Sequence, residues 1–395
     1  MVVSPNNVTS LPQAVTTPVD GSLRGLQERE DFSIVVMETI VFVVLWILAL
    51  LGNILVVLVI RRSRRMQSTT NYFVVSIAFS DLTLILLSAP FVCVRVVMQE
   101  WAAGHLMCRL VRLLQFFSTS SVSFILVAIC IDRFYTIVHP LSFKVTRDTA
   151  KKMIVVGWGL SLIISSMCVY FFEQVVLKNA DTGQQRYACP TFIPGGHWSG
   201  VLYACLCVVS QYLCPLILVV VGYSRTFIYI KSLRDQVRLH RRLNNPISRT
   251  KFKMVKMLMF LSALTFVLYL PFYATQMFHT AAYKRLLSAQ AFISSFWLIC
   301  ASAAAKPTIY ACGNSNFWRG CKEVLCMSTM RCYRLNTYIV TNASSVSKNN
   351  YVGVIDLSKD QTSIRVDSPL EPFSAVLYEG KGVWQTSGSL PSASI

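Results

Sequence analysis

A lysine lies in the middle of a strongly apolar stretch near the end of the chain. The stretch reads ASAAAKPTIYACGN over residues 301–314, and the lysine is Lys306. An ammonium group in hydrocarbon costs about 3 kcal/mol on insertion scales, and more on an isolated helix. We therefore expect a nearby group that accepts the charge, and a role for the pair that the two groups form.

The composition is typical of a chain that crosses a membrane. The 395 residues are 54% hydrophobic and only 14% charged, and the mean hydropathy is +0.52. Apolar segments long enough to cross about 30 Å of bilayer recur along the sequence. They lie at about 34–60, 71–98, 107–137, 153–173, 199–230, 256–279 and 287–312. The sequence therefore predicts an all-α membrane protein, a seven-transmembrane helix bundle.

The basic residues indicate which loops face the cytoplasm. The formal net charge is +19, and the excess gathers between spans one and two, three and four, and five and six. Loops rich in lysine and arginine stay in the cytoplasm. We expect a multi-pass plasma-membrane protein with an extracellular N-terminus, a cytoplasmic C-terminus and no cleavable signal peptide. Because topology accounts for the basicity, nucleic-acid binding is not expected.

Four parts follow from this topology. Residues 1–33 form an extracellular segment in which Asn7, within NVT, fits a glycosylation acceptor. Residues 34–312 form the bundle in the lipid bilayer, and residues 313–326 form a short amphipathic eighth helix. Residues 327–395 mix serine and threonine with charges and are expected to be a disordered cytoplasmic tail.

Unusual residues recur in the spans, about one motif to each helix. In chain order they are Gly52 and Asn53; Asp81 in SIAFSD; Cys108; Asp132 and Arg133 in IDRFYTIVHPL; Trp158; Pro215 and Tyr223; Pro271 in LYLP; and Lys306, Pro307 and Tyr310 in KPTIY. Each motif alone is weak, but together, and in this order, they resemble the rhodopsin-like family of G-protein-coupled receptors over residues 34 to about 330.

The resemblance implies a switch at the inner end of span three. In the family this arginine, here Arg133, rests against the preceding acid, here Asp132, and turns toward a heterotrimeric G protein when span six moves outward. The coupling and switch residues implied are Asp132, Arg133, Phe134, Pro140, Leu141, Tyr223, Pro307 and Tyr310. The alternative for Arg133 is an arginine that extends to the lipid headgroups without a signalling role.

The cysteines divide between the two sides of the membrane. The resemblance implies a disulfide between Cys108 and Cys189, which both face the oxidising side. On the inner side, Cys321, Cys326 and Cys332 are candidates for palmitoylation. A zinc site there is less consistent, because no histidine is near and the spacing is irregular. We expect no metal and no cofactor.

The tail offers regulatory sites. Its Ser344, Ser345 and Ser347 are candidate phosphorylation sites for receptor kinases, which would lead to arrestin binding. A solvated linker without a regulatory role is the alternative.

The partner expected for Lys306 is Asp81. In most of the family the residue before this proline is asparagine or aspartate, and a sodium ion binds near the carboxylate of span two. With a rise of about 1.5 Å per residue, Lys306 lies about 10 Å and Asp81 about 15 Å above the inner ends of their helices. A lysine side chain spans that difference, so we assign Asp81, Lys306 and Asn53 to an intramembrane ion-pair site. The alternative is a lysine that extends to the inner headgroups.

Two other chemistries fit less well. The lysine that binds retinal in opsins would align with Cys300, where no lysine stands. A transporter or proton relay would use an intramembrane charge pair, but the sequence has no repeated half. A receptor fold that does not signal is a further alternative, and the retained switch residues argue against it.

One residue of the outer crevice argues against a class of ligand. Gln115 stands where amine receptors carry an aspartate, so a monoamine ligand is not expected. Eight residues form the candidate ligand pocket: Arg95, Arg112, Gln115, Tyr269, Phe272, Tyr273, Gln276 and Trp297. Their aromatic and basic character favours a peptide ligand, although each residue also fits a packing role.

Three departures concern the switch region. Tyr269 replaces the usual tryptophan, Ser123 and Thr265 replace bulky apolar residues, and the arginine motif reads DRF instead of the commoner DRY. No acid lies at the base of span six, which reads RTKFKMVK. These residues indicate a lower barrier between states and ligand-independent activity, but a reduced ligand response is equally consistent with them.

Overall fold

A computed structural model describes residues 32–63, 66, 68–139, 145–178, 185–193, 198–239, 249–282 and 289–329. The predictions for Asn7, Pro140, Leu141, Cys332 and the tail serines lie outside these residues. The chain divides into two compact units, Met1–Cys326 and Met327–Ile395. The helices and sites described below lie in the first unit.

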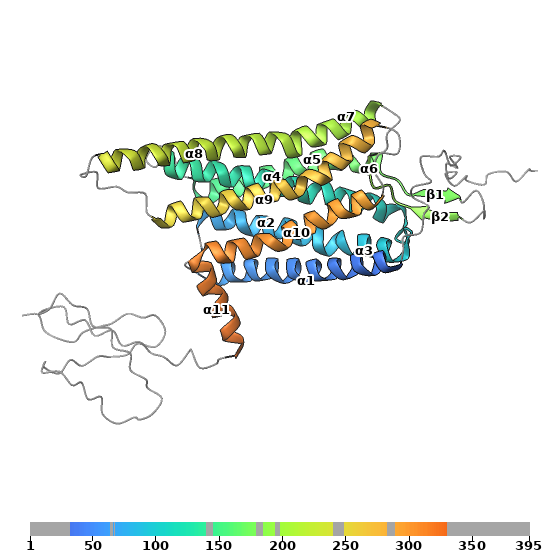
Figure 1. Ribbon diagram of the computed structural model, residues 1–395, viewed down its shortest axis with the longest axis horizontal. Coiled ribbons are helices and arrows are strands. Elements are labelled where there is room, and N and C mark those ends of the chain that lie inside the picture. Colours follow the sequence, from blue (N-terminus) through green and yellow to red (C-terminus); the bar gives the residue numbers. More distant parts are fainter. Residues whose placement is uncertain are drawn as a thin grey trace, which may run out of the picture. The chain divides into compact units, whose positions relative to one another are not determined.

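The described residues are mostly helical (Figure 1). The elements are α1 (Phe32–Arg62), α2 (Thr69–Leu87), α3 (Ala89–Met98), α4 (Gly104–Val138), α5 (Arg147–Ser166), α6 (Cys168–Phe171), α7 (Trp198–Cys207), the π-helical turn η3 (Val208–Leu213), α8 (Cys214–Leu239), α9 (Arg249–Ala282), α10 (Ala289–Gly313) and α11 (Ser315–Thr329). Among the described residues, seven helical segments are long and apolar enough to cross a membrane. The predicted fold class is confirmed, and α11 is the short eighth helix.

Several spans are interrupted, and each interruption has a local cause. The second span is two helices, α2 and α3, which meet at Ser88 just before Pro90. The fifth span passes through η3 before Pro215. Pro271 and Pro307 lie inside α9 and α10. A proline removes a backbone hydrogen bond and bends the helix, so these spans can flex at fixed points.

A short hairpin lies at one end of the bundle, which we call the outer end; we call the opposite end, near α11, the inner end. Strands β1 (Val175–Lys178) and β2 (Gln185–Ala188) pair antiparallel, with Val175 opposite Ala188. In Figure 1 the hairpin lies at one end of the helices and α11 at the other. The disulfide between Cys108 and Cys189 joins the start of α4 to the residue after β2, as predicted.

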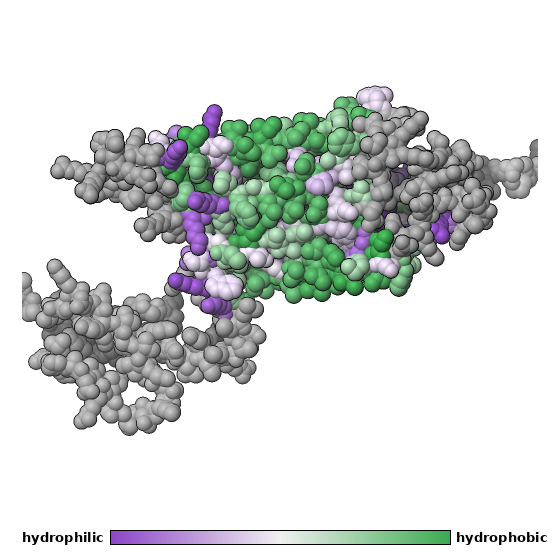
Figure 2. Space-filling model, in the orientation of Figure 1, coloured by the Kyte–Doolittle hydropathy of each residue, from purple (hydrophilic) through white to green (hydrophobic). Residues whose placement is uncertain are grey.

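The bundle has a polar interior and an apolar exterior. Figure 2 shows a broad hydrophobic band over the middle of the helices, with hydrophilic residues toward the end that carries α11. Inside, α4 carries a run of buried hydroxyl residues: Ser118, Thr119, Ser120, Ser121 and Ser123. This distribution suits a protein solvated by lipid, where hydroxyl groups bond between helices and apolar groups face the hydrocarbon. The helix α4 packs against α2, α5 and α8, so it occupies a central position.

Two glycines allow close approach of neighbouring helices. A Cβ atom on Gly313 would lie 2.1 Å from Sδ of Met257, where α10 meets α9. A Cβ atom on Gly222 would lie 2.5 Å from Sγ of Cys130, where α8 meets α4. Contacts this short are not tolerated, so a larger residue at either position would force the side chain of Met257 or Cys130 to move.

Candidate functional site

An ion pair lies at the centre of the bundle. Nζ of Lys306 on α10 lies 2.8 Å from Oδ1 of Asp81 on α2. The two residues are 4% and 1% exposed. Nζ also donates a hydrogen bond of 3.3 Å to Oη of Tyr269 on α9 and lies 5.4 Å from the centre of that ring. Three helices therefore meet at one ammonium group, which combines a charge-assisted hydrogen bond with a cation–π contact.

The segment before Asp81 is positioned by the hydroxyl groups of α4. Oγ of Ser118 donates to the backbone oxygen of Ser80 at 2.9 Å, and Oγ of Ser121 donates to Oγ of Ser80 at 2.8 Å. Each such bond between helices contributes about 1 kcal/mol or less in a membrane protein. Together they fix the position of α2 along the axis of α4. They therefore also fix the depth of the Asp81 carboxylate in the bundle.

Two residues lie elsewhere than the sequence analysis placed them. Tyr269 was expected in the outer crevice but is buried and contacts the ion pair, because its hydroxyl points to the α2–α10 side of α9. Asn53 was assigned to the ion pair, but its Nδ2 donates to the backbone oxygens of Ala49 and Ala303, at 2.8 and 3.0 Å. Asn53 therefore joins α1 to α10 without touching either charge.

The inner end of α4 holds a second ion pair. Oδ2 of Asp132 accepts hydrogen bonds from Nη2 and Nε of Arg133, at 2.5 and 3.1 Å. The same carboxylate accepts from the hydroxyls of Thr70, at 3.1 Å, and Thr69, at 3.3 Å. The side chain of Arg133 is 16% exposed, whereas that of Asp132 is 1% exposed. The acid is thus fixed by α2, and the arginine is held by the acid.

The two threonines were missed by the sequence analysis. The sequence shows only that two hydroxyl residues begin the second helix. Hydroxyl residues are common at helix starts, so this pattern did not indicate a contact with Asp132.

The inner ends of α2, α10 and α11 are joined through one tyrosine. Oη of Tyr310 donates to Oδ1 of Asn71 at 2.6 Å, and Nδ2 of Asn314 donates to the same Oη at 3.0 Å. The ring of Tyr310 lies 5.0 Å from that of Phe317. Tyr310 is therefore bound to α2 and α11, and Tyr223 on α8 is also buried.

Phe134 lies beside Arg133 on α4. Its ring packs edge-on against those of Tyr135 and His139, at 5.5 and 5.7 Å.

Most of the predicted pocket residues are enclosed. Arg112, Gln115, Phe272, Tyr273 and Gln276 are all buried at the outer end of the bundle. Arg95 is partly buried. Trp297 packs on Phe42 with ring centres 4.7 Å apart, so it belongs to the contact between α10 and α1.

Residues Thr191–Ile193, which we call the strap, lie across this outer end. The side chain of Gln276 on α9 binds the strap twice: its Nε2 donates to the oxygen of Thr191 at 3.0 Å, and its Oε1 accepts from the nitrogen of Ile193 at 3.2 Å. Oγ1 of Thr280 donates to the oxygen of Ile193 at 2.9 Å. The strap begins two residues after Cys189, so the disulfide and α9 hold it from two sides.

One palmitoylation candidate is disfavoured by its surroundings. Cys321 on α11 is 3% exposed, and burial raises the pKa of its thiol. Fewer molecules then carry the thiolate that attacks an acyl donor. Cys326 belongs to α11, but its side chain lies outside the described residues.

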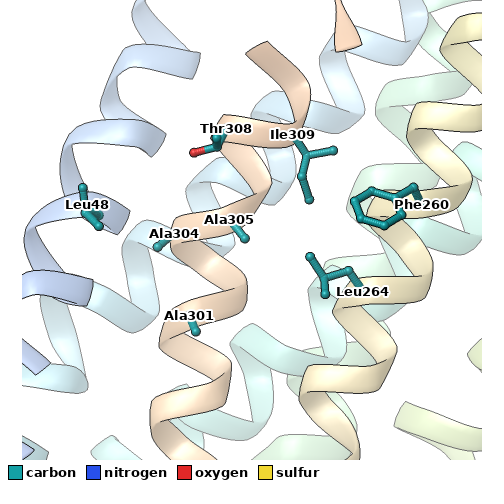
Figure 3. A pocket seen from close by; sticks show the side chains of 8 residues that line it. All are labelled: Leu48, Phe260, Leu264, Ala301, Ala304, Ala305, Thr308 and Ile309. Atoms are coloured by element: carbon teal, nitrogen blue, oxygen red, sulfur yellow. The ribbon is translucent and has the colours of Figure 1, made fainter. Parts of the chain in front are cut away.

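A shallow hollow of about 360 Å³ opens on the side of the bundle, between α1, α9 and α10 (Figure 3). It is lined by Leu48 of α1, Phe260 and Leu264 of α9, and Ala301, Ala304, Ala305, Thr308 and Ile309 of α10. The lining is apolar apart from one hydroxyl, and the hollow lies on the hydrophobic band. It suits bilayer lipid rather than ligand chemistry.

Comparison with known proteins agrees with this geometry. A family model described as 7 transmembrane receptor (rhodopsin family) matches residues 52–310. Probable G-protein coupled receptor 19 of Mus musculus is 38% identical over 91% of this chain and 84% of its own length. The Homo sapiens protein of the same name is 37% identical over the same shares. Neuropeptide FF receptor 2 of Mus musculus is 28% identical over 71% of this chain and 70% of its own length. The chain therefore belongs to the rhodopsin family of seven-transmembrane receptors, a family of receptors rather than enzymes.

Proposed function

We propose that this chain is a plasma-membrane receptor that activates heterotrimeric G proteins when a peptide binds at its extracellular face. The observation that carries the proposal is the pair of Asp132 and Arg133 at the inner end of α4. The carboxylate is anchored to α2, while the arginine is attached only to the carboxylate among the described residues. Such an arrangement leaves the guanidinium able to turn toward a partner without disturbing the helix contacts.

The resting arrangement of the neighbouring helices supports the same proposal. Met257 of α9 fills the space beside Gly313 of α10, so the inner ends of these helices are closed. Pro271 and Pro307 give both helices a point at which to bend. A packed contact at the inner end and a bend near the middle are what a two-state switch needs.

A peptide is the favoured ligand class. One relative is named for a neuropeptide, and Gln115 replaces the aspartate that an amine would need. The hairpin and the strap form a large outer surface with polar backbone groups, which suits an extended chain better than a small molecule. In this proposal the N-terminus is extracellular, and receptor kinases and arrestin act on the tail.

The ammonium of Lys306 is proposed to stand in for the sodium ion of the wider family. It lies 2.8 Å from the carboxylate that would otherwise bind the ion, and it is enclosed with it. The receptor then carries its own cation at this site and needs none from solution.

Ligand-free activation of the main G-protein classes tests the proposed function. Wild type is compared with Arg133→Ala and with Lys152→Ala, which removes an exposed cytoplasmic cation on α5 and serves as the matched control. All three are expressed to the same surface density. We expect activity above that of cells without the receptor in wild type and Lys152→Ala, and loss of that activity in Arg133→Ala.

Equal activity in all three variants would contradict the assigned role of Arg133. An absence of activity in every class would leave a receptor that is silent without its ligand, or a receptor fold without signalling or a transporter.

A further inference from the structure

The guanidinium of Arg112 is enclosed at the outer end of α4, and no acidic residue in the described part of the chain pairs with it. The residue is 2% exposed. Its Nη1 donates to Oε1 of Gln115 at 2.9 Å. Within the described part of the chain, no ion pair includes Arg112, and the charged side chain that acts on it electrostatically is Arg95 of α3, which has the same sign. The charge is therefore buried and not neutralised.

Aromatic rings compensate for only part of this burial. The guanidinium carbon lies 4.5 Å from the ring centre of Phe292 and 5.7 Å from that of Phe172. Ring faces attract the cation but do not take the N–H groups that point outward in the guanidinium plane. An arginine has five such donors in a fixed fork, which matches the two oxygens of a carboxylate.

Three buried donors on α4 have no hydrogen-bond partner among the described residues: Nε of Arg109, Nε of Arg112 and Nε2 of Gln115. Arg109 has a carboxylate nearby, because its Nη2 lies 3.7 Å from Oε1 of Glu173. Arg112 and Gln115 have none among the described residues. Because Oε1 of Gln115 accepts from Arg112, the orientation of the amide is fixed and its nitrogen must be the free donor. Buried donors are rarely left unpaired. Those of Arg112 and Gln115, three residues apart on one helix, indicate that an acceptor belongs between them.

The strap contacts one of the two rings that pack on Arg112. Phe192 in the strap packs edge-on against Phe292, with ring centres 6.0 Å apart. The ring of Phe292 in turn makes a cation–π contact with the guanidinium of Arg112. The strap is attached to α9 by three hydrogen bonds and no ion pair among the described residues. A ligand that lifts the strap reaches the guanidinium directly.

We propose that Arg112 and Gln115 form a binding subsite for a carboxylate of the extracellular ligand. The inference rests on the proposed function, because it takes the ligand to be a peptide. The carboxylate lies against Arg112 Nε and Gln115 Nε2, and the rings of Phe172 and Phe292 flank it. Its source is either the C-terminus of the peptide or an aspartate or glutamate side chain.

The test uses the purified full-length receptor and three small probes. N-acetyl-phenylalanine presents a C-terminal carboxylate, the α-amide of N-acetyl-aspartate presents a side-chain carboxylate, and N-acetyl-phenylalaninamide presents none. The melting temperature of the receptor is measured against the concentration of each probe. The variants are Arg112→Gln and, as matched control, Arg109→Gln, which removes an arginine one turn further out on α4 that lies 3.7 Å from Glu173.

We expect at least one acid to raise the melting temperature of wild type and Arg109→Gln, and the amide to have no effect. In Arg112→Gln the half-maximal concentration should rise about ten- to hundredfold, the value of a charge-assisted hydrogen bond. Gln115→Leu, which keeps the arginine, should raise it about tenfold. The acid that acts identifies the source of the carboxylate.

The proposal is overturned if neither acid shifts the melting temperature of wild type, if the amide acts as strongly as the acids, or if the shift survives in Arg112→Gln. The assay needs no G protein, so its failure is distinguishable from failure of the proposed signalling function. A receptor that signals through Arg133 but ignores both acids would retain the function and lose this subsite.

Discussion

Two cations are buried in the interior of the bundle, and their surroundings differ in one respect. Lys306 lies against the carboxylate of Asp81 and the hydroxyl of Tyr269. Arg112 lies against two aromatic rings and an amide oxygen, with no carboxylate among the described residues. Both residues are almost inaccessible to solvent. Burial alone therefore does not separate a structural charge from a binding charge, whereas the presence of a counter-charge does.

The difference has an energetic meaning. A buried pair is costly to form but much more costly to break, because removal of one partner leaves the other charged and unpaired. An isolated buried charge is already unpaired, so its removal should raise the free energy of unfolding. The two sites should respond to the same kind of substitution with opposite signs.

The largest effect is expected from Lys306→Met. This substitution leaves Asp81 enclosed without a counter-charge and should lower the free energy of unfolding by about 3–5 kcal/mol. The melting temperature and surface expression of the variant measure the loss. The double variant Asp81→Asn with Lys306→Met removes both charges and should recover most of it. A double variant as unstable as the single one would show that the pair contributes nothing specific.

Arg112→Met should act in the opposite direction. It removes an unpaired charge and keeps a long apolar side chain between Phe172 and Phe292, so the ligand-free receptor should gain about 1–2 kcal/mol. Arg109→Met, at a partly exposed ion pair, should change stability by less than about 1 kcal/mol. Thermal unfolding without ligand gives both values. A loss as large as that of Lys306→Met would make Arg112 a structural charge and remove the contrast.

Gln115→Glu gives Arg112 a carboxylate partner, as Lys306 has in Asp81. The new carboxylate stands where Oε1 of Gln115 already lies 2.9 Å from Arg112, so it should pair with the guanidinium and raise stability by about 1 kcal/mol. The same change should abolish the shift in melting temperature caused by N-acetyl-phenylalanine, because it neutralises the guanidinium and removes the Nε2 donor. A probe that still binds this variant would locate the probe elsewhere.

The smallest effect concerns sodium. Replacement of sodium chloride by choline chloride at constant ionic strength should leave the melting temperature of wild type unchanged, because the ammonium of Lys306 already neutralises Asp81. Lys306→Asn should restore a dependence of about 0.4 kcal/mol at a sodium concentration equal to Kd. Sodium dependence in wild type would show that the ion enters beside the lysine.

The contact between Lys306 and Asp81 could be anticipated because a membrane constrains helices. Spans of known length, with known rise per residue and nearly parallel axes, fix the depth of each side chain from its position in sequence. The same reasoning did not place Tyr269, because depth says nothing about which side of α9 faces α10. It also treated α2 and α3 as one span, although Pro90 was a visible signal of the break.

Some contacts at the ends of the bundle could not be predicted from the sequence, because they join segments that are far apart in the chain. Gln276 binds a loop segment 83 and 85 residues earlier in the chain. Thr70 binds Asp132 across 62 residues. The missing acceptor at Arg112 is of the same kind, because it becomes visible only when every neighbour of the side chain is in place.

The contact of Met257 with Gly313 also has a consequence. It closes the inner ends of α9 and α10 with a thioether against bare backbone, and neither group carries a charge. Changes in cytoplasmic salt or acidity act on charges and therefore leave this closure intact. The fit itself has no slack, since even the first carbon of a side chain at position 313 would collide with sulfur. This contact is thus indifferent to its ionic surroundings, whereas a methyl group added at position 313 would force the side chain of Met257 to move.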